Sequence, residues 1–415
     1  MSLPLSFQAA KVALVSSKQT LIELRRHLHA HPELSHHEQQ TTALLAQRLR
    51  ALGFDVRVRP SGLGILAEIA PPGFDVATHP TVAIRADMDA LPIEEQNDVA
   101  YKSTYPGVMH ACGHDVHMTC AMGAAIALSA IKDQLPGRVR IVYQHAEESA
   151  PSGAPDMVEF GALEDACGIV ALHCDPERPT GTIGIREGAL TAAFDRFILT
   201  LKGKSGHGAR PHDCVDPIFA GTQLAQALYT FTSRNFDARE AMVLSLGTFH
   251  AGEVPNAIPD EATLSGTVRT LSNERRAHVE PMLRRCAQSV CDLTGTTYEL
   301  DLYQGAPAII NHPGVVSVLK EVACEVLGAQ HVQDIALPSM GSEDFSQYTQ
   351  RIPGAMFRLG TAIQGRTLYK LHSSRFNVDE RAIELGASIL AQTALRMLEA
   401  KAHDPTFLTD APTPS

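Results

Sequence analysis

The stretch TVAIRADMD, from Thr81 to Asp89, decides the class of fold. Its short apolar run is typical of a buried strand, and charged residues follow where the strand is expected to end. Two later apolar runs end in the same way: RVRIVYQ is followed by His145, Glu147 and Glu148, and CGIVAL by His173 and Asp175. Ligands of open α/β sheets bind beyond the carboxyl ends of the strands, so we expect these groups to converge on one crevice.

Helical patterns alternate with these strands, which predicts an α/β domain with a mostly parallel mixed sheet between helices. Between residues 190 and 302 the order changes to strand, helix, two strands, helix and strand. This order resembles a complete ferredoxin-like α+β module. We therefore predict a larger domain formed by residues 1–189 and 303–415, with the module of residues 190–302 inserted into it.

The composition limits the partners that this chain can bind. At 415 residues, with 44% hydrophobic and 20% charged residues, it is typical of a globular protein of more than one domain. A formal net charge of -11 argues against nucleic acid as a partner, because phosphate binding depends on Lys and Arg.

No apolar run is long enough to span a bilayer, and no secretory signal is recognisable. Eight cysteines without CxxC pairs favour a reducing compartment, and we expect a cytoplasmic protein.

The segment MHACGHDVHM, from Met109 to Met118, adds sulfur and imidazole groups to the same crevice. Cys112 comes just before a predicted helix, whose N-terminus would lower the pKa of its thiol, so we expect a thiolate at neutral pH. Mixed sulfur, nitrogen and oxygen ligands suit zinc or a neighbouring first-row ion. Each motif also has a simpler interpretation, because an EE pair is usually exposed and a lone cysteine usually packs as a small hydrophobe. A cysteine nucleophile paired with a histidine is also chemically conceivable.

Nine ordered motifs across nearly the whole chain resemble the metal-dependent amidohydrolases that include hippurate hydrolases, N-acyl-amino-acid amidohydrolases and auxin-conjugate hydrolases, relatives of aminoacylase and glutamate carboxypeptidase. The motifs are RRHLHAHPELSHHE, RADMDALPIEE, MHACGHDVHM, AEE, GIVALHCDPERPTGTIG, GHGARPHDCVDPI, VPNAIPDEATLSGTVRT, MGSEDF and LHSSRFNVDE. The resemblance implies that the larger domain is catalytic and that the inserted module is a lid and dimerisation domain.

The resemblance also implies a dinuclear centre with two divalent ions per subunit, which could be zinc, manganese, cobalt or nickel. Its implied ligands are Cys112, His114, Glu148, His173 and His372. Glu147 would be the general base, and Asp87 would position other groups without binding a metal. In the inserted module, His207 would stabilise the oxyanion in the active site of the partner subunit. Asn256 and Arg269 would hold the carboxylate of the substrate.

The expected reaction is metal-dependent hydrolysis of an N-acyl-amino acid, or of a similar amide with a free carboxylate, by a homodimer. A dipeptidase or carboxypeptidase on the same site is the nearest alternative, and a non-catalytic binding homologue is a third. His145 stands where relatives often carry proline, and we expect an extra polar contact or a structural role for it. Most of the histidines among positions 27, 29, 31, 36 and 37 are expected to be solvated rather than metal-binding.

Overall fold

The computed structural model describes residues 5–237 and 239–409, which form two compact units. The first unit contains the residues up to Leu190, the segment Ile310–Leu337 and the described residues from Asp344 onward. The second unit contains Thr191–Ile309 and Pro338–Glu343. Within the described residues, no helix is both long enough and apolar enough to cross a membrane.

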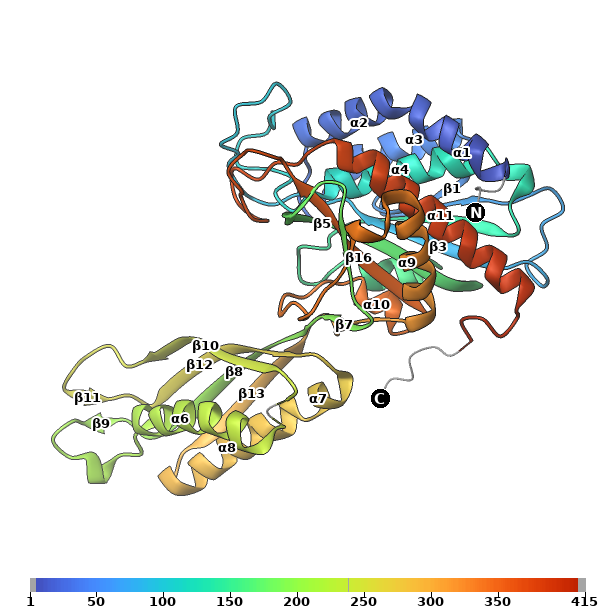
Figure 1. Ribbon diagram of the computed structural model, residues 1–415. Helices are drawn as coiled ribbons and strands as arrows, with labels where there is room; N and C mark the ends of the chain where they lie inside the picture. The colour runs from blue at the N-terminus through green and yellow to red at the C-terminus, as the bar shows by residue number, and fades with distance from the viewer. Residues whose placement is uncertain (1–4, 238, 410–415) are drawn as a thin grey trace. The chain divides into compact units, whose positions relative to one another are not determined.

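The first unit is built on an eight-stranded sheet with the order β1-β2-β4-β3-β5-β16-β6-β15. Strands β1, β3, β5 and β16 of this sheet are labelled in Figure 1. The central strands β4, β3, β5 and β16 are parallel to one another, while β1, β2 and β6 introduce antiparallel pairs. This mixed, mostly parallel sheet confirms the predicted fold class. The strands are β1 (Asp55–Val58), β2 (Ile65–Ile69), β3 (Thr81–Asp87), β4 (Arg138–Gln144), β5 (Ala166–Pro179), β6 (Ile183–Ile185), β15 (Val332–Asp334) and β16 (Gly354–Ala362).

Helices cover the sheet of the first unit, and α4 and α11 pack both on its central strands and on each other. The crossing of these two helices is close, since a Cβ on Gly123 would lie 2.6 Å from the Cβ of Ala387. The Ala-rich run that follows His114 is almost completely buried for this reason. The helices are α1 (Leu5–Ser16), α2 (Lys18–Ala30), α3 (Gln39–Ala51), α4 (His114–Ser129), α5 (Ala154–Glu159), α9 (Pro313–Leu327), α10 (Ser346–Thr349) and α11 (Arg381–His403).

A buried ionic network joins α2 to the first turn of α4. The Arg25 Nε–H donates to Asp115 Oδ2 at 2.9 Å, and both side chains are inaccessible to solvent. His29 contacts the same oxygen at 2.8 Å through Nδ1 and lies 3.2 Å from Glu95 through Nε2. The other histidines of the early cluster, at positions 27, 31, 36 and 37, are exposed as expected. His29 is the exception, because its helical position faces α4 rather than solvent.

The second unit is a four-stranded antiparallel sheet with the order β10-β12-β8-β13, which confirms the inserted α+β module. Helices α6 and α8 pack against this sheet, and their apolar faces enclose a separate core that includes Phe197, Leu224 and Leu283. The elements are β8 (Ala193–Lys202), β9 (Gly206–His207), α6 (Pro217–Asn235), β10 (Met242–Ala251), β11 (Ala257–Ile258), β12 (Glu261–Thr270), α7 (Asn273–Ala277), α8 (Val279–Thr294) and β13 (Thr297–Gln304). The chain passes between the units through β7 (Gly188–Thr191) and β14 (Ile309–Asn311).

Candidate metal centre

Three adjacent parallel strands of the first unit carry polar groups to the same edge of the sheet. Asp87, the last residue of β3, is in register with Gln144, the last residue of β4. His173 lies on β5, which pairs with β3 on its other side. The predicted convergence of these groups is therefore confirmed by the register, although β5 continues past His173 to Pro179 instead of ending before it.

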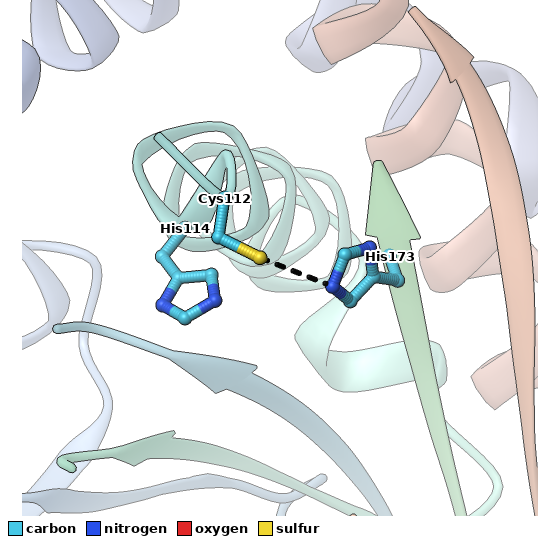
Figure 2. A group of neighbouring side chains, drawn as sticks. All are labelled: Cys112, His114 and His173. Atoms are coloured by element: carbon cyan, nitrogen blue, oxygen red, sulfur yellow. Dashed lines mark hydrogen bonds between the residues drawn. The ribbon is translucent and has the colours of Figure 1, made fainter. Parts of the chain in front are cut away.

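Cys112 and His114 reach this edge from the turn that begins α4. Gly113, at the N-cap position, has a φ of 90°, which favours glycine over other residues. A Cβ at this position would also lie 2.9 Å from Cys174 Sγ. Figure 2 shows the result: Cys112 Sγ is directed toward His173 on β5, at 3.5 Å from its Nε2, with His114 beside it.

Glu148 and His372 join the same cluster from distant parts of the chain. Glu148 Oε1 lies 3.1 Å from His372 Nε2 and 3.9 Å from His114 Nε2. The possible ligand atoms fall into overlapping groups that lie within 4.8 Å of one another: Cys112, His114 and His173; Cys112, Glu148 and His372; and His114, Glu147 and Glu148. The structure therefore brings together all five residues expected as ligands, with the expected base beside them.

The hydrogen bonds of the histidines fit a divalent cation. His114 Nδ1–H donates to the carbonyl oxygen of Asp89 and His173 Nδ1–H to that of Cys174, both at 2.8 Å. Each bond leaves Nε2 to face the cluster, which is the arrangement that metal-binding histidines use. Within the described residues, His114 Nε2 is buried without a hydrogen-bond partner, and Glu148 Oε1, although 3.1 Å from His372 Nε2, is buried without a hydrogen bond of normal geometry. A metal ion would satisfy both atoms, so the donor set fits the implied cofactor.

The electrostatics of the metal-free cluster correct one expectation. Burial raises the pKa of the Cys112 thiol well above its usual value, and the carboxylates of Glu148 and Glu147 raise it further. The expected thiolate is therefore wrong for the metal-free protein, because desolvation and carboxylates outweigh the helix N-terminus. Although burial opposes the charge of His114, Asp87 beside it raises the pKa of that imidazole to about 10. Metal binding would then displace protons from this site.

Asp87 contacts the residues that position the cluster. It is completely buried, and its carboxylate accepts hydrogen bonds from Arg85 Nη1 at 2.7 Å and from His117 Nδ1 at 2.6 Å. His117 Nε2 in turn accepts the backbone N–H of Cys174 at 2.8 Å. With both ring nitrogens engaged, His117 acts as a link between β3, α4 and β5. Sequence reasoning had not assigned this role, although the i, i+3 spacing of His114 and His117 places both on one helix face.

Asp89 is a second supporting residue, and the sequence motifs predict no separate role for it. Its carbonyl oxygen orients His114, and its Oδ2 accepts the backbone N–H of Glu148 at 2.9 Å. Its position at the end of β3, two residues after Asp87, was the available signal. His145, by contrast, turns away from the cluster to contact Arg59 Nη1 and Asp156 Oδ2 at 3.2 and 3.3 Å. Because the ring itself is buried, these contacts fit the expected polar contact or structural role of His145.

The second unit holds the three remaining predicted site residues in two places. His207 on β9 is exposed and pairs with Ala257 on β11, and Gly208 donates its N–H to the carbonyl oxygen of Asn256 at 2.9 Å. Ala209 donates its N–H to His207 Nδ1 at 3.0 Å, so the neutral imidazole carries its proton on Nε2. Arg269 lies near the opposite end of β12, where it donates to the carbonyl oxygen of Met340 at 2.8 Å. Thus β9 and β11 bring His207 and Asn256 together, but not Arg269.

Together, the fold and the ligand cluster define a metal-dependent hydrolase. The sequence profile of "Peptidase family M20/M25/M40" matches residues 83–396, and the chain belongs to this family. It is an enzyme of the M20 metallo-amidohydrolase and peptidase class.

Similar proteins include both amidohydrolases and peptidases. An N-acyl-L-amino acid amidohydrolase of Geobacillus stearothermophilus is 39% identical over 71% of this chain and 79% of its own length. The N-acetyl-L-cysteine deacetylase of Bacillus subtilis is 35% identical over 96% and 92%. The thermostable carboxypeptidase 2 of Saccharolobus solfataricus is 37% identical over 91% and 95%.

A solved structure gives the same fold. The Bacillus subtilis YXEP protein, described as a dinuclear metal binding peptidase of the M20 family, superposes with a TM-score of 0.81 at 34% identity, covering 93% of this chain and 99% of its own.

Proposed function

We propose that this enzyme uses two divalent cations to hydrolyse the amide bond of N-acyl-amino acids, or of similar amides with a free carboxylate. The observation that carries the proposal is the overlap of the ligand groups around Glu148, with Glu147 next to it. The proposed ligands are Cys112, His114, Glu148, His173 and His372. Zinc, manganese, cobalt and nickel all suit this mixture of sulfur, nitrogen and oxygen.

The side chains of the cluster supply a route for the proton. When bound, the cations supply Lewis-acid activation of the attacking water and of the scissile carbonyl group. Glu147 accepts the proton of the attacking water and delivers it to the leaving nitrogen, so the amine departs uncharged. His207 Nε2–H is suited to donate a hydrogen bond to the oxyanion of the tetrahedral intermediate. Asn256 and Arg269 are assigned to the substrate carboxylate, for which the planar guanidinium of Arg269 is suited.

The names of the relatives support acyl-amino acids as the substrate class and keep a carboxypeptidase or dipeptidase as the nearest alternative. Both classes present a carboxylate near an amide bond, so the same site could serve either. A cysteine-nucleophile amidase is disfavoured because Cys112 is buried and its pKa is raised by burial.

A substrate panel with controlled metal content tests the proposed reaction. We expect release of free amino acid from at least one of N-acetyl-, N-benzoyl- or indoleacetyl-amino acids, loss of this activity after chelation, and recovery when metal is restored. Metal content per subunit, measured in parallel, should be two. Faster cleavage of dipeptides would favour the peptidase alternative, and activity that survives complete metal removal would contradict the metal mechanism.

We also propose that the enzyme is a homodimer formed through the second unit. Strand β10 lies at the edge of the four-stranded sheet, and none of its residues is buried; Val243 and Phe249 are each 40% exposed. An exposed edge strand of this length is a template for pairing with another chain. The eight residue steps from Glu261 to Arg269 span roughly 26 Å along β12, which separates Arg269 from the β9 and β11 end of the sheet. One copy of this unit is therefore poorly suited to place His207 and Arg269 on one small substrate, whereas two copies could.

Mixing two inactive variants tests whether His207 serves the neighbouring subunit. If it does, a dimer of His207→Ala with Glu147→Gln contains one intact site. Equal mixing after complete subunit exchange should then restore about one quarter of the wild-type activity. Native mass spectrometry should verify the mixed dimer, and each variant alone is the control. No recovery in a verified mixed dimer would place His207 in its own subunit or outside the reaction.

A cytoplasmic location stays a prediction. It is supported by the eight cysteines, all of which are free thiols in the described residues.

A further inference from the structure

The loop of residues 33–38, between α2 and α3, contacts both segments that carry carboxylates into the metal cluster. The Ser35 hydroxyl donates to Asp89 Oδ2 at 2.6 Å, and that oxygen also accepts the backbone N–H of Glu148. The backbone of the loop is joined to Ala90, which donates its N–H to the carbonyl oxygen of Glu33 at 2.8 Å. The HPELSHHE motif of the sequence therefore lies against the cluster without contributing a proposed ligand.

Glu38 makes the most direct of these contacts. Its side chain is fully buried, and its Oε1 accepts the backbone N–H of Ala146 at 2.7 Å. Ala146 immediately precedes Glu147 and has a φ of 52°, a left-handed conformation that a non-glycine residue adopts only when its surroundings hold it there. On the other side, the carbonyl oxygen of Ala146 accepts the N–H of Gly153 at 2.8 Å. Both peptide groups of Ala146 are thus fixed, one of them by Glu38.

We propose that Glu38 is a positioning residue that fixes the turn carrying Glu147 and Glu148, an inference that rests on the proposed function of these two carboxylates. Without its acceptor, the buried N–H of Ala146 loses its bond, and the strained turn can relax to a negative φ. Such a relaxation redirects the following residue, which is the proposed base. Glu38 itself touches neither the substrate nor the metal.

Glutamine is the appropriate conservative replacement for Glu38. Burial raises the pKa of Glu38 to about 7, and the charge of Asp89 contributes to the shift. The carboxyl group is therefore partly protonated near neutral pH, and an uncharged amide is close to it in shape and charge. The amide oxygen of glutamine can accept the same N–H of Ala146.

The first test compares Glu38→Ala, Glu38→Gln and the control His37→Ala, which alters an exposed neighbour in the same loop. At saturating metal, we expect Glu38→Ala to lower kcat about 10- to 100-fold with a smaller change in KM. Glu38→Gln should recover most of the activity, and His37→Ala should match the wild type. Rates are expressed per folded subunit, so a loss of stability alone does not move them. An unchanged kcat in folded Glu38→Ala would overturn the proposal.

The second test does not need a substrate. Titrating the metal-free proteins with Co²⁺ should show an altered visible spectrum and about 10-fold weaker binding in Glu38→Ala, but not in Glu38→Gln. If the substrate panel fails for the wild type, the proposed reaction is wrong, and this titration still decides whether Glu38 positions the cluster. If Glu38→Ala does not fold, Glu38→Asp replaces it, because its shorter side chain cannot reach Ala146. A wild-type spectrum and wild-type affinity in the folded variant would overturn the positioning role.

Discussion

Glu147→Gln is expected to lower kcat by about 10²- to 10⁴-fold, the usual contribution of a general base, while both metal ions stay bound. The amide has the shape of the carboxylate but cannot accept the proton of the attacking water. Glu147 lies close enough to His114 and Glu148 to reach a cation, but it is proposed as the base and not as a ligand, so its replacement should leave the metal content unchanged. The measurements are kcat on the best substrate of the panel and metal per subunit by elemental analysis.

The contrasting variant is His114→Ala, which removes a group that belongs to three of the candidate ligand sets, one of them with Asp87 and His117. It should lose both metal and activity, because the cluster loses an imidazole ligand that the remaining contact between Glu148 and His372 does not replace. If excess metal restored activity to His114→Ala, the result would still fit the mechanism. Normal turnover in a fully metal-loaded Glu147→Gln protein would remove Glu147 as the base.

Asp115→Asn is expected to lower the free energy of unfolding of the metal-free protein by about 3–5 kcal/mol at pH 6. The substitution leaves the buried guanidinium of Arg25 without its main counter-charge and weakens the contact to His29. Although burial alone would raise it, the charges of Arg25 and His29 hold the pKa of Asp115 well below its usual range. Chemical denaturation of both proteins gives the difference directly.

The pH dependence of this difference has a defined sign. The pKa of Asp115 is lower in the folded protein than in the unfolded chain, where it is about 4. The carboxylate therefore contributes stability above about pH 4, and this contribution is lost as the pH falls. Burial and the charge of Arg25 lower the pKa of His29, but Asp115 raises it above the ordinary value. The stability that charged His29 contributes is therefore complete below about pH 6.5, the pKa of histidine in the unfolded chain, and is lost at higher pH. The difference should therefore be largest between about pH 4 and 6.5. The control is Lys18→Gln, which breaks the exposed pair with Glu384 and should cost less than about 1 kcal/mol. An equally small effect of Asp115→Asn would show that the buried network does not stabilise the fold.

The fold could be predicted because its signals are local. Short apolar runs such as TVAI and IVAL mark strands wherever they occur, and their order with the helical segments is typical of an α/β sheet. The change in the order of predicted strands and helices near residue 190 likewise marks the inserted module. Both the alternation of apolar and polar residues in strands and the periodicity of helices are visible over a few residues. The burial of His29 could not be predicted in this way, because it depends on α4 packing against α2.

The candidate site was partly predictable for the same reason. Residues at the carboxyl end of a strand or just after it, such as Asp87 and Glu148, must gather at one edge of a parallel sheet, whatever the details of packing. The supporting roles of Asp89, His117 and Glu38 were not visible, because each depends on a hydrogen bond to a backbone group brought close by the fold. The ionisation expected for Cys112 is wrong for the metal-free protein because the helix terminus is local, whereas burial and the neighbouring carboxylates that raise the pKa of the thiol come from the fold.

The sequence by itself determined the class of fold, the family and the chemical types that gather at the strand ends, because strand and helix patterns and ordered motifs are properties of neighbouring residues. Only the tertiary structure decided which atoms face one another: His372 beside Glu148, Glu38 beneath Ala146, and His207 far along the sheet from Arg269. Contacts, burial and pKa values depend on segments that are distant in the chain, and packing alone brings those segments together.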